Sequence, residues 1–145
     1  MFTHLLIATD GSELAARAES TGLALAKRLG ARVTVVTATE PWSAMTNGET
    51  IAFDFPIEEY EKAARQQARG VLAKAHEAAD KLGVVCETVH AVDFAAEAII
   101  AAAKDRKCDL IVMASHGRRG MKRLLLGSQA QRVVTLSSLP VLVCR

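Results

Sequence analysis

The residues best suited to binding chemistry lie in one stretch of the chain, between positions 109 and 128. The stretch opens with the apolar run Leu110 to Ala114, whose length and branched side chains predict a buried strand. A segment that contains Gly117 and Gly120 follows, and Gly127-Ser128 then opens a predicted helix. A strand, a glycine-containing loop and a helix start together present backbone N–H groups, which bind phosphate in α/β proteins. The stretch therefore predicts an anion site.

Positive charge is concentrated in the same part of the chain. Residues 110–145 carry six Lys and Arg side chains and neither Asp nor Glu, although the formal net charge of the whole chain is only +2. This asymmetry indicates an anionic ligand or surface, and Arg118 and Arg119 are the strongest phosphate candidates. Solvated cations, turn glycines and a helix cap explain the same residues without a ligand, so the pattern alone leaves both interpretations open.

The helices and strands that would position these residues are predicted from hydrophobic periodicity and from turn residues. Strands are predicted at residues 5–9, 33–39, 84–92, 110–114 and 141–144, and helices after the turn at Asp10-Gly-Ser-Glu13, over 57–82, after Asp93 and over 128–136. Asp10 and Asp93 are predicted N-caps of their helices. The first helix is expected to bury a face made of Leu14, Ala18, Gly22, Leu25 and Leu29.

Strands that alternate with helices predict parallel pairing with helices on both faces, in a single domain over residues 1–145. Such doubly wound, Rossmann-like sheets bind ligands beyond the carboxyl ends of strands, at the point where the strand order reverses. Strands one and four end at Asp10 and Ser115, so Asp10 is a candidate for contact with a ribose hydroxyl or a metal. The irregular segment 40–56 is long for a connection, which is typical of functional or mobile loops.

Composition excludes several other classes of protein. No apolar run approaches the roughly 18 residues of a membrane helix, and the N-terminus lacks the pattern of a signal peptide. Three widely spaced cysteines match no metal or redox motif, so reduced thiols and a cytoplasmic location are expected. The net charge is too small to indicate nucleic acid, and no constellation of metal ligands can be assembled.

The residues carry a family resemblance from end to end: the chain resembles the universal stress protein family. The segments that carry it are Leu5 to Ser12, Asp109 to Met113, Ser115 to Gly117, Leu126 to Ser128 and Leu139 to Val143. Nucleotide-binding members of that family have Gly, two residues, Gly, nine residues and Gly-Ser or Gly-Thr. Gly117 and Gly127-Ser128 fit this pattern, whereas Ala114 stands at the first glycine position.

The resemblance implies a five-stranded parallel sheet of order 3-2-1-4-5 that binds ATP, or AMP or ADP, with or without Mg²⁺, between strands one and four. It also implies a homodimer joined through the strand Val141–Cys144, which an apolar sheet edge favours as well. The residues implied to surround the nucleotide are Ala8, Thr9, Asp10, Ala38, Met113, Ala114, Ser115, His116, Gly117, Arg118, Arg119, Gly120, Gly127, Ser128 and Gln129.

The predicted function is that of a regulatory protein of the stress response that binds ATP and signals to a protein partner the sequence does not identify. No residue is placed as a committed general base, so the chain is not predicted to be an efficient ATPase, and hydrolysis should be slow at most. The alternative is a nucleotide-independent interaction module of the same fold, whose basic last third docks an acidic protein or a membrane-surface partner. A flavodoxin or a phospho-receiver is disfavoured, because Asp10 has no neighbouring acids after the first strand.

Overall fold

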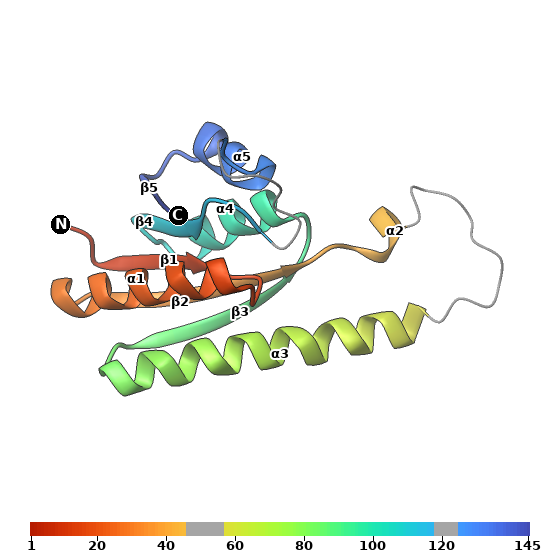
Figure 1. The fold of residues 1–145 in the computed structure, drawn as a ribbon, viewed down its shortest axis with the longest axis horizontal. Coiled ribbons are helices and arrows are strands. Elements are labelled where there is room, and N and C mark those ends of the chain that lie inside the picture. Colours follow the sequence, from red (N-terminus) through yellow and green to blue (C-terminus); the bar gives the residue numbers. More distant parts are fainter. Residues whose placement is uncertain (46–56, 118–124) are drawn as a thin grey trace.

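The computed structural model describes residues 1–45, 57–117 and 125–145. Five strands form one parallel sheet in the order β3-β2-β1-β4-β5 (Figure 1), which confirms the predicted architecture. The order of the strands reverses between β1 and β4, which pair side by side. The strands are β1 (His4–Ala8), β2 (Arg32–Thr39), β3 (Cys86–Val92), β4 (Leu110–Ala114) and β5 (Val141–Cys144).

Helices cover both faces of the sheet. They are α1 (Glu13–Leu29), the short α2 (Trp42–Met45), α3 (Ile57–Leu82), α4 (Ala95–Asp105) and α5 (Ser128–Leu136). Side chains of β1 alternate between the two faces: Leu5 and Ile7 pack with α1 and α3, whereas Leu6 and Ala8 pack with α4 and α5. All five residues of β1 and of β4 are buried, as expected for central strands of a parallel sheet.

The predicted bounds of α3, β4, α5 and β5 are confirmed to the residue, but the buried face of α1 differs from the prediction. Ala18 and Gly22 are buried as predicted, whereas Leu14 and Leu25 are only partly buried and Leu29 is 42% exposed. The buried face is completed by Ala15, Leu23 and Ala26. The prediction was wrong because it weighted leucines, while α1 lies so close to the sheet that small residues fill much of the contact.

Both predicted aspartate caps are also wrong. Ser12 is the N-cap of α1, and its hydroxyl accepts a hydrogen bond from the Ala15 N–H (3.2 Å). Phe94 precedes α4 without a side-chain cap bond, and the Asp93 carboxylate instead accepts from the Phe94 N–H (2.8 Å). The helix α2 lies within the segment 40–56 that was predicted to be irregular, and residues 46–56 of that segment fall outside the described residues.

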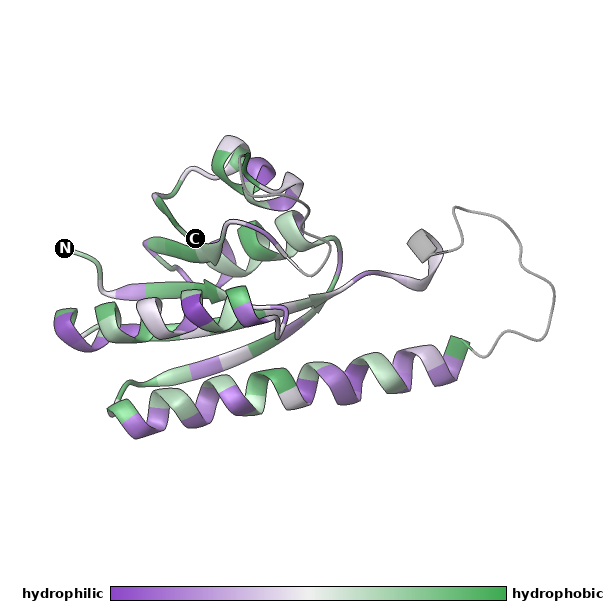
Figure 2. Cartoon of the chain, in the orientation of Figure 1, coloured by the Kyte–Doolittle hydropathy of each residue, from purple (hydrophilic) through white to green (hydrophobic). Residues whose placement is uncertain are grey.

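Hydropathy follows this packing along the chain. Figure 2 shows hydrophobic residues along β1 and β4, and hydrophilic residues interspersed with hydrophobic ones along the whole length of α3. Over the parts of the chain that the structure describes, no helix is both long enough and apolar enough to cross a membrane.

Candidate functional site

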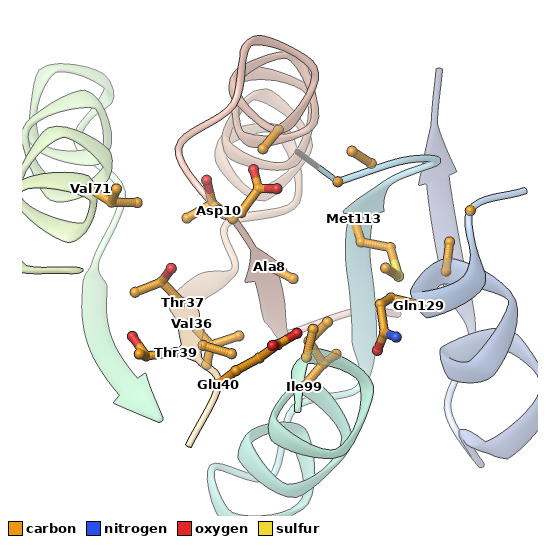
Figure 3. Close-up of a pocket in the computed structure, with 18 of the residues that line it drawn as sticks. Ala8, Asp10, Val36, Thr37, Thr39, Glu40, Val71, Ile99, Met113 and Gln129 are labelled. Carbon is orange, nitrogen blue, oxygen red and sulfur yellow. The ribbon is translucent and has the colours of Figure 1, made fainter. Parts of the chain in front are cut away.

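A cavity of about 850 Å³ lies at the carboxyl ends of the central strands. Ala8 and Asp10 of the β1 end, Met113 of β4 and Gln129 of α5 stand around it (Figure 3). It therefore occupies the β1/β4 position at which the strand order reverses, where doubly wound sheets bind their ligands. Its volume is within the range of roughly 300–1,000 Å³ typical of small-molecule sites.

The turn after β1 is fixed by side chains as well as by backbone. The Thr9 hydroxyl accepts from the Gly11 N–H (3.2 Å) and donates to the carboxylate of Glu19 on α1. The Asp10 carboxylate accepts from the Ser12 N–H (2.9 Å). Gly11 has a φ of 78°, a left-handed conformation that favours glycine. These contacts hold Asp10 at the cavity, with its second oxygen near the β4 loop.

The turn after β4 is the other half of the site. The Ser115 N–H donates to the Cys144 carbonyl (2.7 Å), which carries the β4–β5 pairing one residue past the strand. The Ser115 carbonyl then accepts from the Gly127 N–H (2.8 Å), so the start of α5 lies against the end of β4. The Ser115 hydroxyl is buried and is within 3.0 Å of His116 Nδ1.

Two glycines in this half of the site lie close to other atoms of the site. A Cβ on Gly127 would lie 2.9 Å from the Ser115 carbonyl oxygen, and a Cβ on Gly117 would lie 3.1 Å from Asp10 Oδ2. The first distance is shorter than any contact a real Cβ makes with a backbone atom, and the second is tight. Crowding by backbone atoms, rather than an unusual φ, therefore requires glycine at position 127. A side chain at position 117 would displace Asp10 Oδ2 by a few tenths of an ångström.

Ala114 behaves differently from these two glycines. It is the last residue of β4, pairs with Cys144 of β5 and lines the cavity. Because its backbone is still extended, alanine is accommodated there without strain. The departure from the family pattern at this position leaves the strand and its hydrogen bonds intact.

The first turn of α5 lines the cavity. Gly127 is the N-cap, Ser128 is the first helical residue and the first turn contains no acidic side chain. Gln129 Oε1 accepts from the Ala96 N–H (3.1 Å) and so ties α5 to the start of α4. Unpaired N–H groups and the helix dipole make such a terminus attractive to an anion.

The far wall of the cavity is made by the end of β2 and by α3. Ala38 lines it as predicted, together with Glu40 and with Tyr60 of α3. The Tyr60 hydroxyl donates to the Glu40 carbonyl (2.9 Å), and the Tyr60 ring lies 5.0 Å, centroid to centroid, from the ring of Trp42. No pattern in the sequence indicated that Tyr60, in the first turn of α3, reaches the site.

The carboxylate of Glu19 lies beside the site, where it accepts a hydrogen bond from Thr9. Burial raises the pKa of Glu19 above its usual range, the Thr9 hydrogen bond lowers it, and the nearby charge of Asp10 raises it. No group of three or more His, Cys, Asp or Glu side chains that could hold a metal ion occurs among the residues that the structure describes. Among these described side chains the cavity therefore offers hydrogen-bonding and apolar surfaces rather than a ready-made metal centre.

The structure brings most of the predicted residues together. Ser115 does not line the cavity but positions the residues that do, and Arg118, Arg119 and Gly120 lie outside the described residues. The predicted residues that line the cavity are Ala8, Thr9, Asp10, Ala38, Met113, Ala114, His116, Gly117, Gly127, Ser128 and Gln129. Those the prediction missed include Val36, Thr37, Glu40, Tyr60, Gln67, Val71, Ile99 and Leu126, which come mainly from β2, α3 and α4.

Known proteins resemble the chain over its full length. The model of the Universal stress protein family matches residues 1–145. A universal stress protein of Thermus aquaticus is 40% identical over 146 residues, which cover all of both chains. The solved structure of MJ0577, from Methanocaldococcus jannaschii, has a TM-score of 0.84 at 25% identity and covers 99% of this chain and 96% of that one. A universal stress protein solved in complex with cAMP has a TM-score of 0.74 at 26% identity, over 99% and 97% of the two chains.

Proposed function

The chain belongs to the universal stress protein family, and we propose that it binds an adenine nucleotide, with ATP as the first candidate, in the cavity between β1 and β4. Nucleotide binding would regulate a cytoplasmic stress response through a protein partner, with slow hydrolysis of ATP at most. The alternative is an interaction module of the same fold that works without nucleotide.

The observation that carries the proposal is the crowding at Gly127. Only a residue without a side chain fits between the Ser115 carbonyl and the cavity, and this residue opens a helix whose first turn has no acidic group. The arrangement presents N–H groups to the cavity at close range, which suits the phosphate oxygens of a nucleotide. Gly117, close to Asp10, supplies a second point of close backbone approach.

The similarity to a structure with a bound nucleotide supports the same class of ligand. The relative solved in complex with cAMP is 26% identical to this chain over nearly its whole length. That ligand contains adenine, ribose and phosphate, and the cavity here has apolar, carboxylate and N–H surfaces that suit these three parts.

The roles of individual residues follow from their positions. The N–H groups of Ser128 and Gln129 would hold phosphate oxygens. Asp10 would accept from a ribose hydroxyl or meet Mg²⁺, and Ala38 would lie against the base. The nucleotide brings the phosphate charge and the Mg²⁺ affinity, while the chain binds, orients and partly desolvates it. The Ser115 hydroxyl is hydrogen-bonded to His116, and we assign it no role in proton transfer.

Calorimetric titration tests the proposal. ATP, ADP, AMP and cAMP are titrated into the protein with and without Mg²⁺, and saturable binding of at least one of them is expected. Gly127→Val should abolish that binding, because its side chain collides with the Ser115 carbonyl and fills the phosphate position. Gly70→Val is the matched control, since a Cβ there meets no atom within 4 Å.

The result that would contradict the proposal is a flat titration with all four nucleotides on folded protein. A regulatory effect on a partner that persists in Gly127→Val would favour the nucleotide-independent module instead. Far-UV circular dichroism and a thermal melt of each variant show whether lost binding reflects a lost fold.

We also infer a homodimer joined through β5. This strand is at the end of the sheet, and all four of its residues are only partly buried although three are hydrophobic aliphatic side chains. A second copy of the strand across a two-fold axis would cover it. Light scattering should give the mass of a dimer at micromolar concentration, and a monomer mass would contradict the inference.

A further inference from the structure

A glutamate on the body of α1 is hydrogen-bonded to a residue that lines the cavity. Glu19 accepts from the Thr9 hydroxyl, and this bond joins α1 to the end of β1 across 10 positions of sequence. Thr9 is 6% exposed and lines the cavity, whereas Glu19 does not line it. Glu19 can therefore influence a ligand in the cavity through Thr9 or through its charge, but not by direct contact.

The Thr9 hydroxyl uses both its donor and its acceptor within the protein. A threonine hydroxyl has one proton to donate, and here that proton is donated to the Glu19 carboxylate. The same oxygen accepts from the Gly11 N–H (3.2 Å). The carboxylate thus fixes the direction in which the hydroxyl donates, and the oxygen is left to accept from the backbone of the β1–α1 turn.

The bond to Gly11 matters because it holds the backbone that carries Asp10. The Thr9 N–H donates to the Val36 carbonyl (3.0 Å), so β1 is fixed as far as Thr9. On the other side, the Asp10 carboxylate accepts from the Ser12 N–H (2.9 Å) at the start of α1. Between them Gly11 has a left-handed φ of 78°. Side-chain hydrogen bonds from two consecutive residues therefore shape the turn that places Asp10 at the cavity.

The surroundings of Glu19 disfavour its charge. Burial raises the pKa of Glu19, the Thr9 hydrogen bond lowers it, and the nearby charge of Asp10 raises it. An apolar side chain at this position would avoid both the burial of a carboxylate and the repulsion between two acids. Titratable groups held in unfavourable surroundings beside a cavity are often functional. What the carboxylate holds in place is therefore the better explanation of its presence.

We propose that Glu19 is a positioning residue of the nucleotide site, which fixes the turn that presents Asp10 to the ligand by way of the Thr9 hydroxyl. The inference rests on the proposed nucleotide site and goes beyond it by giving a role to a residue outside the cavity wall. The ligand group that meets Asp10 should depend on Glu19. Phosphate oxygens at the start of α5 lie in the other half of the site and should depend on it little.

Substitutions at Glu19 separate positioning from charge. Glu19→Leu keeps the approximate size of the side chain but removes the acceptor, so by calorimetry it should bind ATP with Mg²⁺ about tenfold more weakly than the wild type. Glu19→Gln keeps an acceptor without the charge, so its affinity should lie between these two. If Glu19 acted only as a negative charge near an anionic ligand, both variants would bind ATP more tightly, and that result would overturn the inference.

The matched control removes a carboxylate that also has a hydrogen-bond partner. Glu77 is exposed on α3, pairs with Lys81 (2.8 Å) and does not line the cavity. Glu77→Leu should therefore bind ATP like the wild type. Far-UV circular dichroism and a thermal melt show that each variant is folded at the temperature of the titration, and an unchanged affinity in folded Glu19→Leu would overturn the inference.

The route through Thr9 and Asp10 is tested separately. Thr9→Val lacks the hydroxyl, so adding Glu19→Leu to it should change the affinity by less than about twofold. Thr9→Ser keeps the hydroxyl and should bind more tightly than Thr9→Val. The loss in Glu19→Leu should shrink with 2′,3′-dideoxy-ATP if Asp10 meets the ribose, or without Mg²⁺ if Asp10 meets the metal.

Two results would overturn the inference while leaving the nucleotide site in place. One is additive losses in the Thr9→Val and Glu19→Leu double variant, because the two side chains would then act independently. The other is an equal loss in Glu19→Leu for ATP and 2′,3′-dideoxy-ATP, with and without Mg²⁺, because the effect would then not pass through Asp10. A wild type that binds neither nucleotide refutes the proposed function, and the inference falls with it.

Discussion

Helix α1 lies close to the sheet at Gly22, and this gives a sharp test of the packing. Gly22 lies on the buried face of α1, over β1 and β4. A Cβ at this position would lie 2.7 Å from Ile7 Cδ1, 2.9 Å from Ile7 Cγ1 and 3.3 Å from Val112 Cγ1. Ile7 and Val112 are both 0% exposed, so neither side chain has free space to move into. In Gly22→Ala, either α1 must shift away from the sheet or Ile7 must leave its rotamer.

Two opposing effects set the size of the change. Overpacking of a dense core by an added methyl group destabilises by about 1–3 kcal/mol, whereas replacing glycine by alanine inside a helix stabilises by about 0.5–1 kcal/mol. Gly70→Ala separates them, because Gly70 is an exposed residue of α3 and a Cβ there meets nothing within 4 Å. Both variants gain the helix propensity, but only Gly22→Ala has the collision. Its free energy of unfolding should therefore be lower than that of Gly70→Ala by about 1–3 kcal/mol.

Urea unfolding followed by far-UV circular dichroism measures this difference, at one protein concentration and without nucleotide so that binding does not shift the equilibrium. Gly70→Ala should unfold at higher urea than the wild type, and Gly22→Ala at lower urea than Gly70→Ala. If the two variants were equally stabilised, α1 would not lie as close to Ile7 as the structure has it.

Three further predictions concern the site, the pH dependence of stability and the thiols. Ala114→Gly should bind ATP as tightly as the wild type or more tightly by calorimetry, because it removes a Cβ at the cavity without breaking the β4–β5 pairing; weaker binding would contradict this. Burial alone would raise the pKa of Asp109, but hydrogen bonds from the Thr3 N–H (2.8 Å), the His4 N–H (3.1 Å) and the Thr3 hydroxyl (2.9 Å) outweigh it and lower the pKa. The contribution of Asp109 to the free energy of unfolding is therefore complete above about pH 4. It is lost as the pH falls through the lowered pKa. In urea unfolding, the loss of stability in Asp109→Asn should therefore be full at pH 7 and smaller in acid. Burial raises the pKa of Cys86 and of Cys108 to about 11, so iodoacetamide at pH 7.5 should alkylate both far more slowly in the folded protein than in urea, and equal rates would refute the burial.

Much of the fold follows from local pattern. The bounds of β4 and α5 could be predicted because an apolar run of strand length ends in a glycine-containing turn, and because Gly127-Ser128 opens a helix. The strand order 3-2-1-4-5, which the family resemblance implied, puts Asp10 at the end of β1 beside the end of β4. The 3.1 Å approach of a Gly117 Cβ to Asp10 Oδ2 agrees with that placement.

The predictions that were wrong or missing depended on long-range distances, which a local sequence pattern does not contain. Leu29 was predicted to be buried from its spacing, but the helix ends beside the solvent and its small residues face the sheet instead. Tyr60 and Glu40 are joined by a hydrogen bond across 20 positions of sequence, because the first turns of α3 return over the end of β2. Such a contact requires the length and direction of α3 as well as its periodicity. The α3 wall of the cavity could not be predicted for the same reason.

The glycine pattern of the family separates into two physical requirements in this chain. Gly127 is needed because a side chain would collide with the Ser115 carbonyl, whether or not a ligand is present. A side chain at Gly117 would instead push the Asp10 carboxylate aside. Ala114 meets no such requirement, because β4 is still extended and paired with β5 at that residue. A glycine there would serve only a ligand that approaches the Cα closely. The position therefore affects how closely a phosphate can pack, while the turn that forms the cavity depends on the other two glycines.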